Sequence, residues 1–382
     1  MKRWVIALFV AIGGASVAIG TTAQAQQTVP EIPFDGDVNF FKLPPDMHFG
    51  EASGVAVNSK GQIAVYTRSN SAGGPAYGAT ASQLLLFDQN GKFIREVGKG
   101  LYGWSYAHAI RFDKDDNLWA IDKGSDMIIK FNPEGRVTMV FGRKQEASDD
   151  AKPIERVNPP RAPVNGQFRQ PTDVAFDTQG NIYISDGYIN SRVAKFTKDG
   201  DWVTSIGSPG KEKGQLNTPH GIANDAKGNI YVADRGNRRI QVIDPATNQF
   251  VREIKIDVPS PPDAMPWMGA KPDVARLLSP EAPPGAGTMA PGAPWTVCIT
   301  PPNASGTQYL YAADAYPGRV YKLTLDGKVL GYLGKSGHQA KQFGWIHEIA
   351  CPSENTLFVG ELLNWRVQKL TLHPATAAST GR

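Results

Sequence analysis

Three of the six histidines in this chain occur at equivalent places in a repeated sequence pattern. His108, His220 and His347 each stand at the start of the first strand of a repeat, and these are the second, fourth and sixth repeats. If six repeats form a ring with their first strands at the centre, alternate repeats lie about 120° apart, so the three imidazoles converge. Three converging imidazoles with an open fourth position are typical of zinc. The spacing therefore predicts a zinc site, although iron or another divalent ion could use the same ligands.

A second set of polar residues follows the second strand of each repeat. In an antiparallel meander the second strand ends on the face where the first strand begins, so these residues surround the same mouth. They are Arg68, Lys123, Tyr188, Arg235 and Tyr316. Arginine suits a carboxylate because it donates paired hydrogen bonds, and a tyrosine beside a dication can act as a base. For Lys123 and Tyr316, an ordinary place in a solvated loop is the simpler interpretation.

Repeats of about 40 to 50 residues must position these side chains, and they indicate a propeller or a solenoid. Each repeat has the pattern of a four-stranded antiparallel meander, clearest at residues 168–207 and 218–244. Six such units predict an all-β, six-bladed β-propeller, with an open solenoid as the alternative. The sixth unit lacks its outer strand, which the segment from Val38 can supply. This N-terminal strand would close the ring and cover an exposed strand edge.

The predicted organisation has four parts and two insertions. The parts are a signal peptide at 1–25, an N-terminal segment with the closing strand at 26–50, the propeller at 51–372 and a tail at 373–382. The insertions are proline-bearing loops at 143–167 and 256–293, each between the last strand of one blade and the first of the next. Such long loops are either filler or the walls of a binding site.

The start of the chain predicts export. Lys2 and Arg3 precede an apolar run and the small-residue site Ala23-Gln24-Ala25, which is typical of a signal peptide cleaved after Ala25. An uncleaved membrane anchor is the alternative, because the run approaches the ~20 residues that span a bilayer. No later apolar run is long enough to span one. We therefore expect a periplasmic or secreted protein without a membrane span after cleavage.

The remaining composition limits the partners. The two cysteines, Cys298 and Cys351, lie in the first strands of their repeats, so a disulfide between them is permitted in an oxidising compartment but not required. The net charge of +4 for 382 residues gives no reason to expect nucleic-acid binding. We expect a monomer that binds a small-molecule or peptide-like substrate with a carboxylate.

Three segments resemble a known enzyme family. They are DGYINSRVAKF from Asp186, TPHGIAND from Thr218 and ADRGNRRIQ from Ala233. They resemble the lyase domain of peptidylglycine α-amidating enzymes, a six-bladed propeller of NHL repeats. That domain cleaves peptidyl-α-hydroxyglycine to a peptide amide and glyoxylate. The resemblance covers most of residues 50–370 and is densest at 168–255.

The resemblance implies roles for individual residues. The family's three zinc ligands fall on His108, His220 and His347. Its catalytic tyrosine, in the D-G-Y-x-N-S-R motif, falls on Tyr188. Its active-site arginines fall on Arg235, in the A-D-R-x-N motif, and on Arg68, fourteen residues after the glycine of a G-V-A motif.

The family also holds a structural calcium ion through backbone carbonyls and one acidic side chain. The matching positions are Val55, Ile110 and Glu348, and oxygen donors suit this hard cation. Two departures lie at the third zinc ligand. The family's Met-Pro-His is replaced by Trp-Ile-His ending at His347, and the acid that follows is Glu348 instead of aspartate. The pocket beside the metal should therefore have a different shape.

Together these observations predict an exported zinc-dependent lyase. It would cleave the C–N bond of a peptidyl- or N-acyl-α-hydroxyglycine-like substrate, giving an amide and glyoxylate. One alternative is a metal-dependent propeller hydrolase or lactonase, which usually gathers acidic and amide side chains around calcium. The other is a non-catalytic NHL-type binding propeller.

Overall fold

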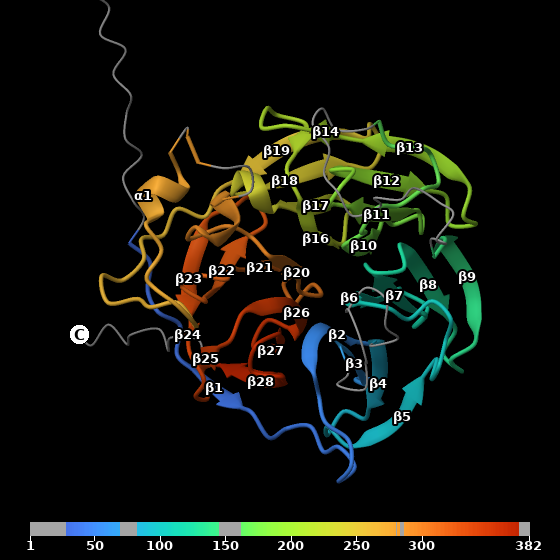
Figure 1. Ribbon diagram of the computed structural model, residues 1–382, viewed down its shortest axis with the longest axis horizontal. Helices are drawn as coiled ribbons and strands as arrows, with labels where there is room; N and C mark the ends of the chain where they lie inside the picture. Colours follow the sequence, from blue (N-terminus) through green and yellow to red (C-terminus); the bar gives the residue numbers. More distant parts are fainter. Residues whose placement is uncertain (1–27, 69–81, 145–161, 280, 283–285, 374–382) are drawn as a thin grey trace, which may run out of the picture.

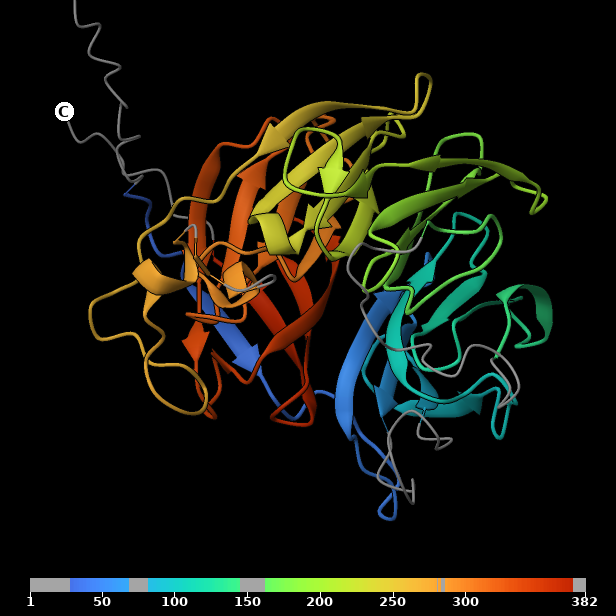
Figure 2. The ribbon, with the colours of Figure 1, turned by 45° about the horizontal axis from the view of Figure 1, so that its top comes forward.

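The computed structural model describes residues 28–68, 82–144, 162–279, 281–282 and 286–373. Within these residues, six four-stranded antiparallel sheets surround a central axis (Figure 1). The protein is therefore an all-β, six-bladed propeller, as the repeats predict. Figure 2 shows the ring tilted, with the blades side by side around it.

Each blade is a meander whose first strand lies nearest the axis. Blade one has β2 (Glu51–Val57), β3 (Ile63–Arg68), β4 (Ser82–Phe87) and β5 (Phe93–Val97). Blade two has β6 (Ala107–Phe112), β7 (Leu118–Asp122), β8 (Met127–Phe131) and β9 (Val137–Gly142). Blade three has β10 (Asp173–Phe176), β11 (Ile182–Asp186), β12 (Arg192–Phe196) and β13 (Trp202–Ile206).

The second half of the ring follows the same plan. Blade four has β16 (Pro219–Asn224), β17 (Ile230–Asp234), β18 (Arg239–Asp244) and β19 (Gln249–Ile254). Blade five has β20 (Thr296–Ile299), β21 (Tyr309–Ala313), β22 (Val320–Thr324) and β23 (Val329–Leu333). Blade six has β26 (Ile346–Ser353), β27 (Thr356–Glu361), β28 (Arg366–Leu372) and, from the other end of the chain, β1 (Phe34–Asp37).

Apolar side chains fill the spaces between neighbouring blades. The second strands β7, β11 and β17 are buried along their whole length, whereas the outer strand β13 alternates between exposed and less exposed residues. This difference arises because inner strands are covered on both faces, while one face of an outer strand meets water. Burial within a blade therefore falls from the inner strands towards the outer strand.

An N-terminal strand closes the ring, but it lies just before the segment expected from Val38. β1 pairs antiparallel with β28, with Phe34 opposite Leu372. The Phe34 side chain is buried in the core shared by blades five and six. The chain after Val38 instead crosses towards blade one, where Phe41 packs edge-on against Phe87 and the Lys42 amide donates to the Gly91 carbonyl.

Blades five and six are also joined covalently. Cys298 in β20 and Cys351 in β26 form a disulfide with a Cα–Cα separation of 6.1 Å. The sequence permits this bond without requiring it, and the structure shows it. The two first strands are neighbours in the ring, which brings the two sulfur atoms together.

The described residues of the insertion at 256–293 lie against blades five and six. It contains α1 (Val274–Leu277) and the 3-10 helix η2 (Ala286–Met289), and α1 lies on the flank of blade five (Figure 1). Trp267 of this insertion donates a hydrogen bond from its indole N–H to Asn364 Oδ1, and the buried Tyr316 donates to the Ala264 carbonyl. Most of the other predicted insertion, 143–167, lies outside the described residues.

Two short parallel strand pairs complete the described elements. They are β14 (Ser208–Pro209) with β15 (Gln215–Leu216), and β24 (Lys335–Ser336) with β25 (Gln342–Phe343). In the described part of the chain, no helix has both the length and the apolar character needed to cross a membrane. The predicted signal peptide, residues 1–25, lies outside the described residues.

Candidate metal centre

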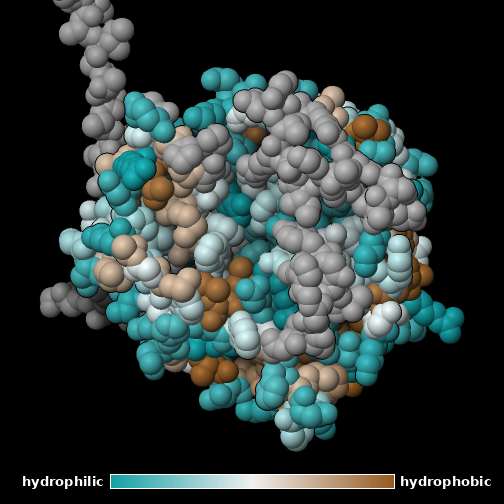
Figure 3. Space-filling view, viewed as in Figure 1, coloured by the Kyte–Doolittle hydropathy of each residue, from teal (hydrophilic) through white to brown (hydrophobic). Residues whose placement is uncertain are grey.

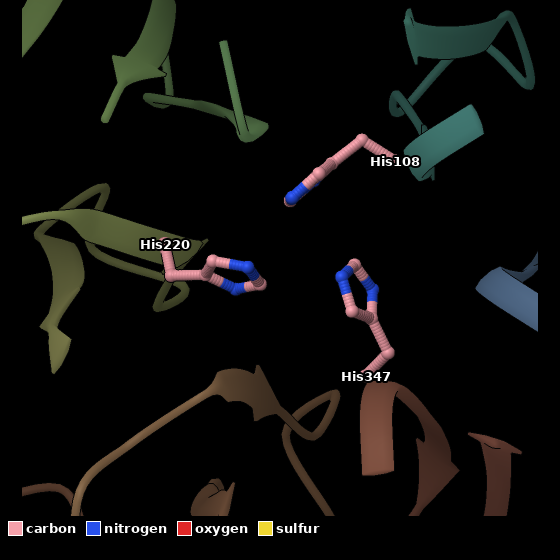
Figure 4. A group of neighbouring side chains, drawn as sticks. All are labelled: His108, His220 and His347. Carbon is pink, nitrogen blue, oxygen red and sulfur yellow. The ribbon is translucent and has the colours of Figure 1, made fainter. Parts of the chain in front are cut away.

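The three histidines at the starts of alternate first strands meet at the propeller axis. His108 comes from β6, His220 from β16 and His347 from β26. One nitrogen of each ring lies within 4.8 Å of the corresponding nitrogens of the other two. All three side chains are buried, and Figure 4 shows their rings facing a common centre. Hydrophilic residues are visible near the centre of the face seen in Figure 3.

Backbone carbonyls of the neighbouring blades orient these rings. Each Nδ1 atom lies at hydrogen-bonding distance from a carbonyl oxygen of the next blade. The pairs are His108 with Thr172 at 2.6 Å, His220 with Trp295 at 2.6 Å and His347 with Ser53 at 2.7 Å. A carbonyl oxygen can only accept, so each neutral ring carries its proton on Nδ1 and presents the lone pair of Nε2 to the centre. Histidines that bind metals are commonly oriented in this way.

The protonation state of the rings also suits a metal site. Burial lowers the pKa of all three histidines well below the usual value. Nearby positive groups lower these pKa values further, including Lys123 for His108 and Arg235 for His220. The rings are therefore neutral at neutral pH, as metal ligands must be.

The donor set fits zinc. Three imidazole nitrogens and an open fourth position are the usual surroundings of catalytic zinc. Among the described residues, this trio forms the one group of three or more histidine, cysteine or acidic side chains whose ligand atoms are so close together.

Tyr188 lies directly beside this centre. Its hydroxyl oxygen is 3.4 Å from His108 Nε2 and 3.3 Å from His220 Nε2. The loop after β11 can approach blade four because residue 187 is glycine. A Cβ atom on Gly187 would lie 1.8 Å from the Pro219 carbonyl oxygen, a distance that no side chain tolerates. This close approach places Tyr188 next to His220.

Three cations set the acidity of Tyr188. Burial of the phenol raises its pKa, but the positive charges of Arg235, Lys123 and Arg68 outweigh burial, and the net pKa is lowered from the usual value. The Lys123 ammonium lies 3.8 Å from the centre of the Tyr188 ring. Lys123 is largely buried and does not occupy the solvated loop position that the sequence favoured.

The two predicted arginines are held in different ways. Arg235, at the start of the 3-10 helix η1 (Arg235–Asn237), has its guanidinium 3.8 Å from the centre of the Trp295 ring and 5.4 Å from that of Tyr188. Arg68 lies over the Tyr106 ring at 3.8 Å, donates from Nε to the Ala107 carbonyl and pairs with Glu51. Both guanidinium groups are thus fixed beside residues of the metal centre.

Trp295 also belongs to the site, although its residue type alone does not indicate a metal ligand. It occupies in blade five the strand position that histidine occupies in blades two, four and six. Its ring packs against His220 and Trp345, with centroid distances of 5.2 Å and 5.0 Å. Its place in the repeat was the available signal. Tyr316, by contrast, is fully buried and holds the insertion at Ala264.

The residues that the resemblance implies for calcium do come together, but with unsuitable groups. The backbone N–H groups of Val55 and Ile110 face Glu348 and donate to its Oε2 at 3.1 and 3.2 Å. On its other oxygen, Glu348 meets the guanidinium of Arg111 at 3.2 Å. Calcium requires oxygen donors, so this arrangement does not fit the ion.

Comparison with known proteins supports the family resemblance. The NHL repeat family model matches residues 168–196 and 216–243. A peptidylglycine alpha-amidating monooxygenase of Rattus norvegicus is 29% identical over 230 residues, which are 54% of this chain and 22% of the relative. A probable peptidyl-alpha-hydroxyglycine alpha-amidating lyase of Caenorhabditis elegans is 26% identical over 181 residues, 44% of this chain and 47% of the relative. The protein is an NHL-repeat propeller resembling the amidating lyase domain.

The extent of similarity limits what transfers to this NHL propeller. A peptidyl-glycine alpha-amidating monooxygenase of Xenopus laevis matches 83% of this chain at 29% identity, but only 31% of the relative's length. The chain thus spans less than half the length of these three relatives.

Solved structures with low sequence identity show the fold alone. A virginiamycin B lyase from Staphylococcus aureus aligns with a TM-score of 0.52 at 13% identity, covering 90% of this chain and 100% of its own. A gluconolactonase from Xanthomonas campestris aligns with a TM-score of 0.51 at 13% identity, covering 85% of this chain and 87% of its own.

Proposed function

We propose that this NHL propeller is an exported, zinc-dependent carbon–nitrogen lyase. Its substrate is a peptidyl- or N-acyl-α-hydroxyglycine-like molecule, which it converts to an amide and glyoxylate. One observation carries the proposal: the Tyr188 hydroxyl lies 3.3 and 3.4 Å from the metal-facing nitrogens of two histidines. The names of the relatives support this reaction class.

The histidines would hold the metal and leave one side open to substrate. A zinc ion bound there would supply Lewis acidity towards the substrate hydroxyl. Because each imidazole is fixed by a carbonyl of the next blade, the three nitrogens need little rearrangement to bind. This pre-organisation lowers the cost of assembling the site.

Tyr188 is the proposed base. As a phenolate it takes the proton of the substrate hydroxyl, and the O–H electron pair becomes the second bond of the glyoxylate carbonyl. The C–N bond breaks, and its electron pair leaves with the amide nitrogen, which receives the proton. No atom beyond substrate and proton is required. The lowered pKa of Tyr188 increases the fraction of phenolate available for this step.

Arg235 and Arg68 are the proposed anchors for the substrate carboxylate. The aromatic face of Trp295 holds the Arg235 guanidinium in one plane, which suits paired hydrogen bonds to a carboxylate. Arg68 donates a hydrogen bond to the Ala107 carbonyl, which directly precedes His108, and this bond holds it at the edge of the proposed metal centre. With its carboxylate fixed, the substrate would direct its hydroxyl towards Tyr188 and the three histidines that would hold the metal.

Turnover of N-benzoyl-α-hydroxyglycine tests this proposal. Tyr188→Phe should lower kcat by about 10²-fold or more, because a positioned base contributes that much. Tyr316→Phe is the matched control, since it removes the hydroxyl of a buried tyrosine that contacts the insertion. Normal turnover by Tyr188→Phe would refute the assigned base. A wild-type protein that binds zinc but produces no glyoxylate would refute the reaction.

A further inference from the structure

A buried charge network lies in the channel beside the three histidines. Arg111 of β6 pairs with Asp173 of β10 through two bonds, Nε to Oδ1 at 3.0 Å and Nη2 to Oδ2 at 2.6 Å. The same Nε is 3.2 Å from Oε1 of Glu348 in β26. Asp173 and Glu348 directly follow residues at the histidine positions of their blades. The side chain of Asp173 is 3% exposed, that of Glu348 is 2% exposed and that of Arg111 is 14% exposed.

All six blades contribute a group to this network. Besides Arg111, Asp173 and Glu348, the partners are main-chain groups. Blades one and two donate the Val55 and Ile110 amides to Glu348 Oε2, blade four donates the Ile222 amide to Asp173 Oδ2, and blade five accepts from Arg111 Nη2 at the Val297 carbonyl. One guanidinium and two carboxylates therefore connect every first strand of the ring.

The polarity of these groups does not suit a metal cation. Calcium takes six to eight oxygen ligands at about 2.3–2.6 Å. The two main-chain groups that face Glu348 are N–H donors, which present positive charge to that side. Both oxygens of Asp173 already accept from Arg111, and they also accept from the Val174 and Ile222 amides.

We propose that Arg111 is the structural cation of the channel and takes the place of a bound calcium ion. Its planar guanidinium can bind one carboxylate with two parallel bonds and still reach a second acid and a carbonyl. By pairing with two buried acids from different blades, it keeps the first strands together around the histidines. This inference is independent of the proposed lyase reaction, since it concerns the stability of the ring.

The wild-type protein provides the first test, through its response to calcium. Thermal unfolding is measured with zinc present and with about 10 mM CaCl2 or MgCl2, above the dissociation constants of weak calcium sites. The expected midpoint is the same in both salts, and elemental analysis should find calcium far below one ion per chain. A midpoint raised selectively by calcium, or one tightly bound calcium per chain, would overturn the proposal.

Substitutions provide the second test. Arg111→Met should lower the thermal midpoint by about 5 to 10 °C, because it leaves two buried acids without a counter-ion. Adding Glu348→Gln to this variant should recover part of the loss by removing one of the two buried acids. A stable Arg111→Met protein, or no recovery in the double variant, would contradict the proposal. If Arg111→Met does not fold, the calcium response of the wild type decides alone.

Arg192 is the matched control for these variants. It is a fully buried arginine that pairs with Asp186 in blade three, away from this network. Arg192→Met should also destabilise the protein. When Glu348→Gln is added to Arg192→Met, the midpoint should fall further instead of rising, because the effects of substitutions at distant sites are additive. Recovery by Glu348→Gln in both backgrounds would indicate a general effect of that substitution and would overturn the specific pairing.

Discussion

Each imidazole of the candidate metal centre is oriented by a blade other than its own. Blades two, four and six supply the rings, and blades three, five and one supply the carbonyls that accept their Nδ1 protons. Because these carbonyls belong to equivalent strand positions, the ring arrangement itself selects the tautomer. The site thus depends on the register between blades as much as on the presence of histidine.

Loss of one of the three imidazoles should therefore remove the metal. We predict that the wild-type protein contains about one zinc ion per chain, and that His108→Ala contains far less, because two imidazoles bind zinc weakly. His338→Ala is the control, since His338 is an exposed histidine that contacts Asn364 instead of the centre. Elemental analysis after dialysis measures the difference. Wild-type protein without any metal would favour the non-catalytic binding propeller.

The cations around Tyr188 make a separate prediction about pH dependence. Lys123 lies over the Tyr188 ring and lowers its pKa, so Lys123→Met should raise that pKa. Because the phenolate is the proposed active form, the rise of kcat with pH should move about one unit towards higher pH. Lys322→Met is the control, since Lys322 lies over the ring of Tyr309 in blade five. An unchanged profile for Lys123→Met would show that Lys123 does not tune the base.

At the scale of elements, the sequence predicts the repeated four-stranded blades but not the contacts between segments that are distant in sequence. The four-stranded blades follow from periodic apolar residues and turns, and the histidine positions follow from their register. The sequence predicts the closing strand one segment too late, because the run from Val38 has more apolar residues than β1, whose sequence is FDGD. Their different partners, Leu372 and Phe87, are far away in sequence.

The closing strand has a measurable contribution to stability. Phe34 is buried in the core between blades five and six. Phe34→Ala should lower the free energy of unfolding by about 3 to 5 kcal/mol, the cost of a large cavity in a core. Ile94→Ala in β5 is the control, because Ile94 is among the exposed apolar residues. Denaturant unfolding measures both, and equal small effects would mean that β1 contributes little to closure.

At the scale of the whole molecule, the closed propeller brings together residues whose structural roles cannot be read from the linear sequence. Arg111 is an example. The equivalent position carries alanine in four other repeats, at Ala56, Ala175, Ala223 and Ala350. A charge at this position was a visible signal, but its partners Asp173 and Glu348 come from blades that only the closed ring places opposite. The environments of Lys123 and Tyr316 likewise depend on packing between distant segments.

The same closure makes the disulfide important for the whole ring. Cys298 and Cys351 join blades five and six across 53 residues of chain. Replacing both by serine should cost about 4 kcal/mol, since the unfolded chain regains the entropy that a loop of this length removes. The thermal midpoint should fall, while zinc content at low temperature should be unchanged because neither sulfur is a proposed ligand. Treatment of the wild type with reductant should give the same shift and leave the double variant unaffected. If the reductant also lowers the thermal midpoint of the double serine variant, it acts at another site. The disulfide would then not be the cause of its effect on the wild type.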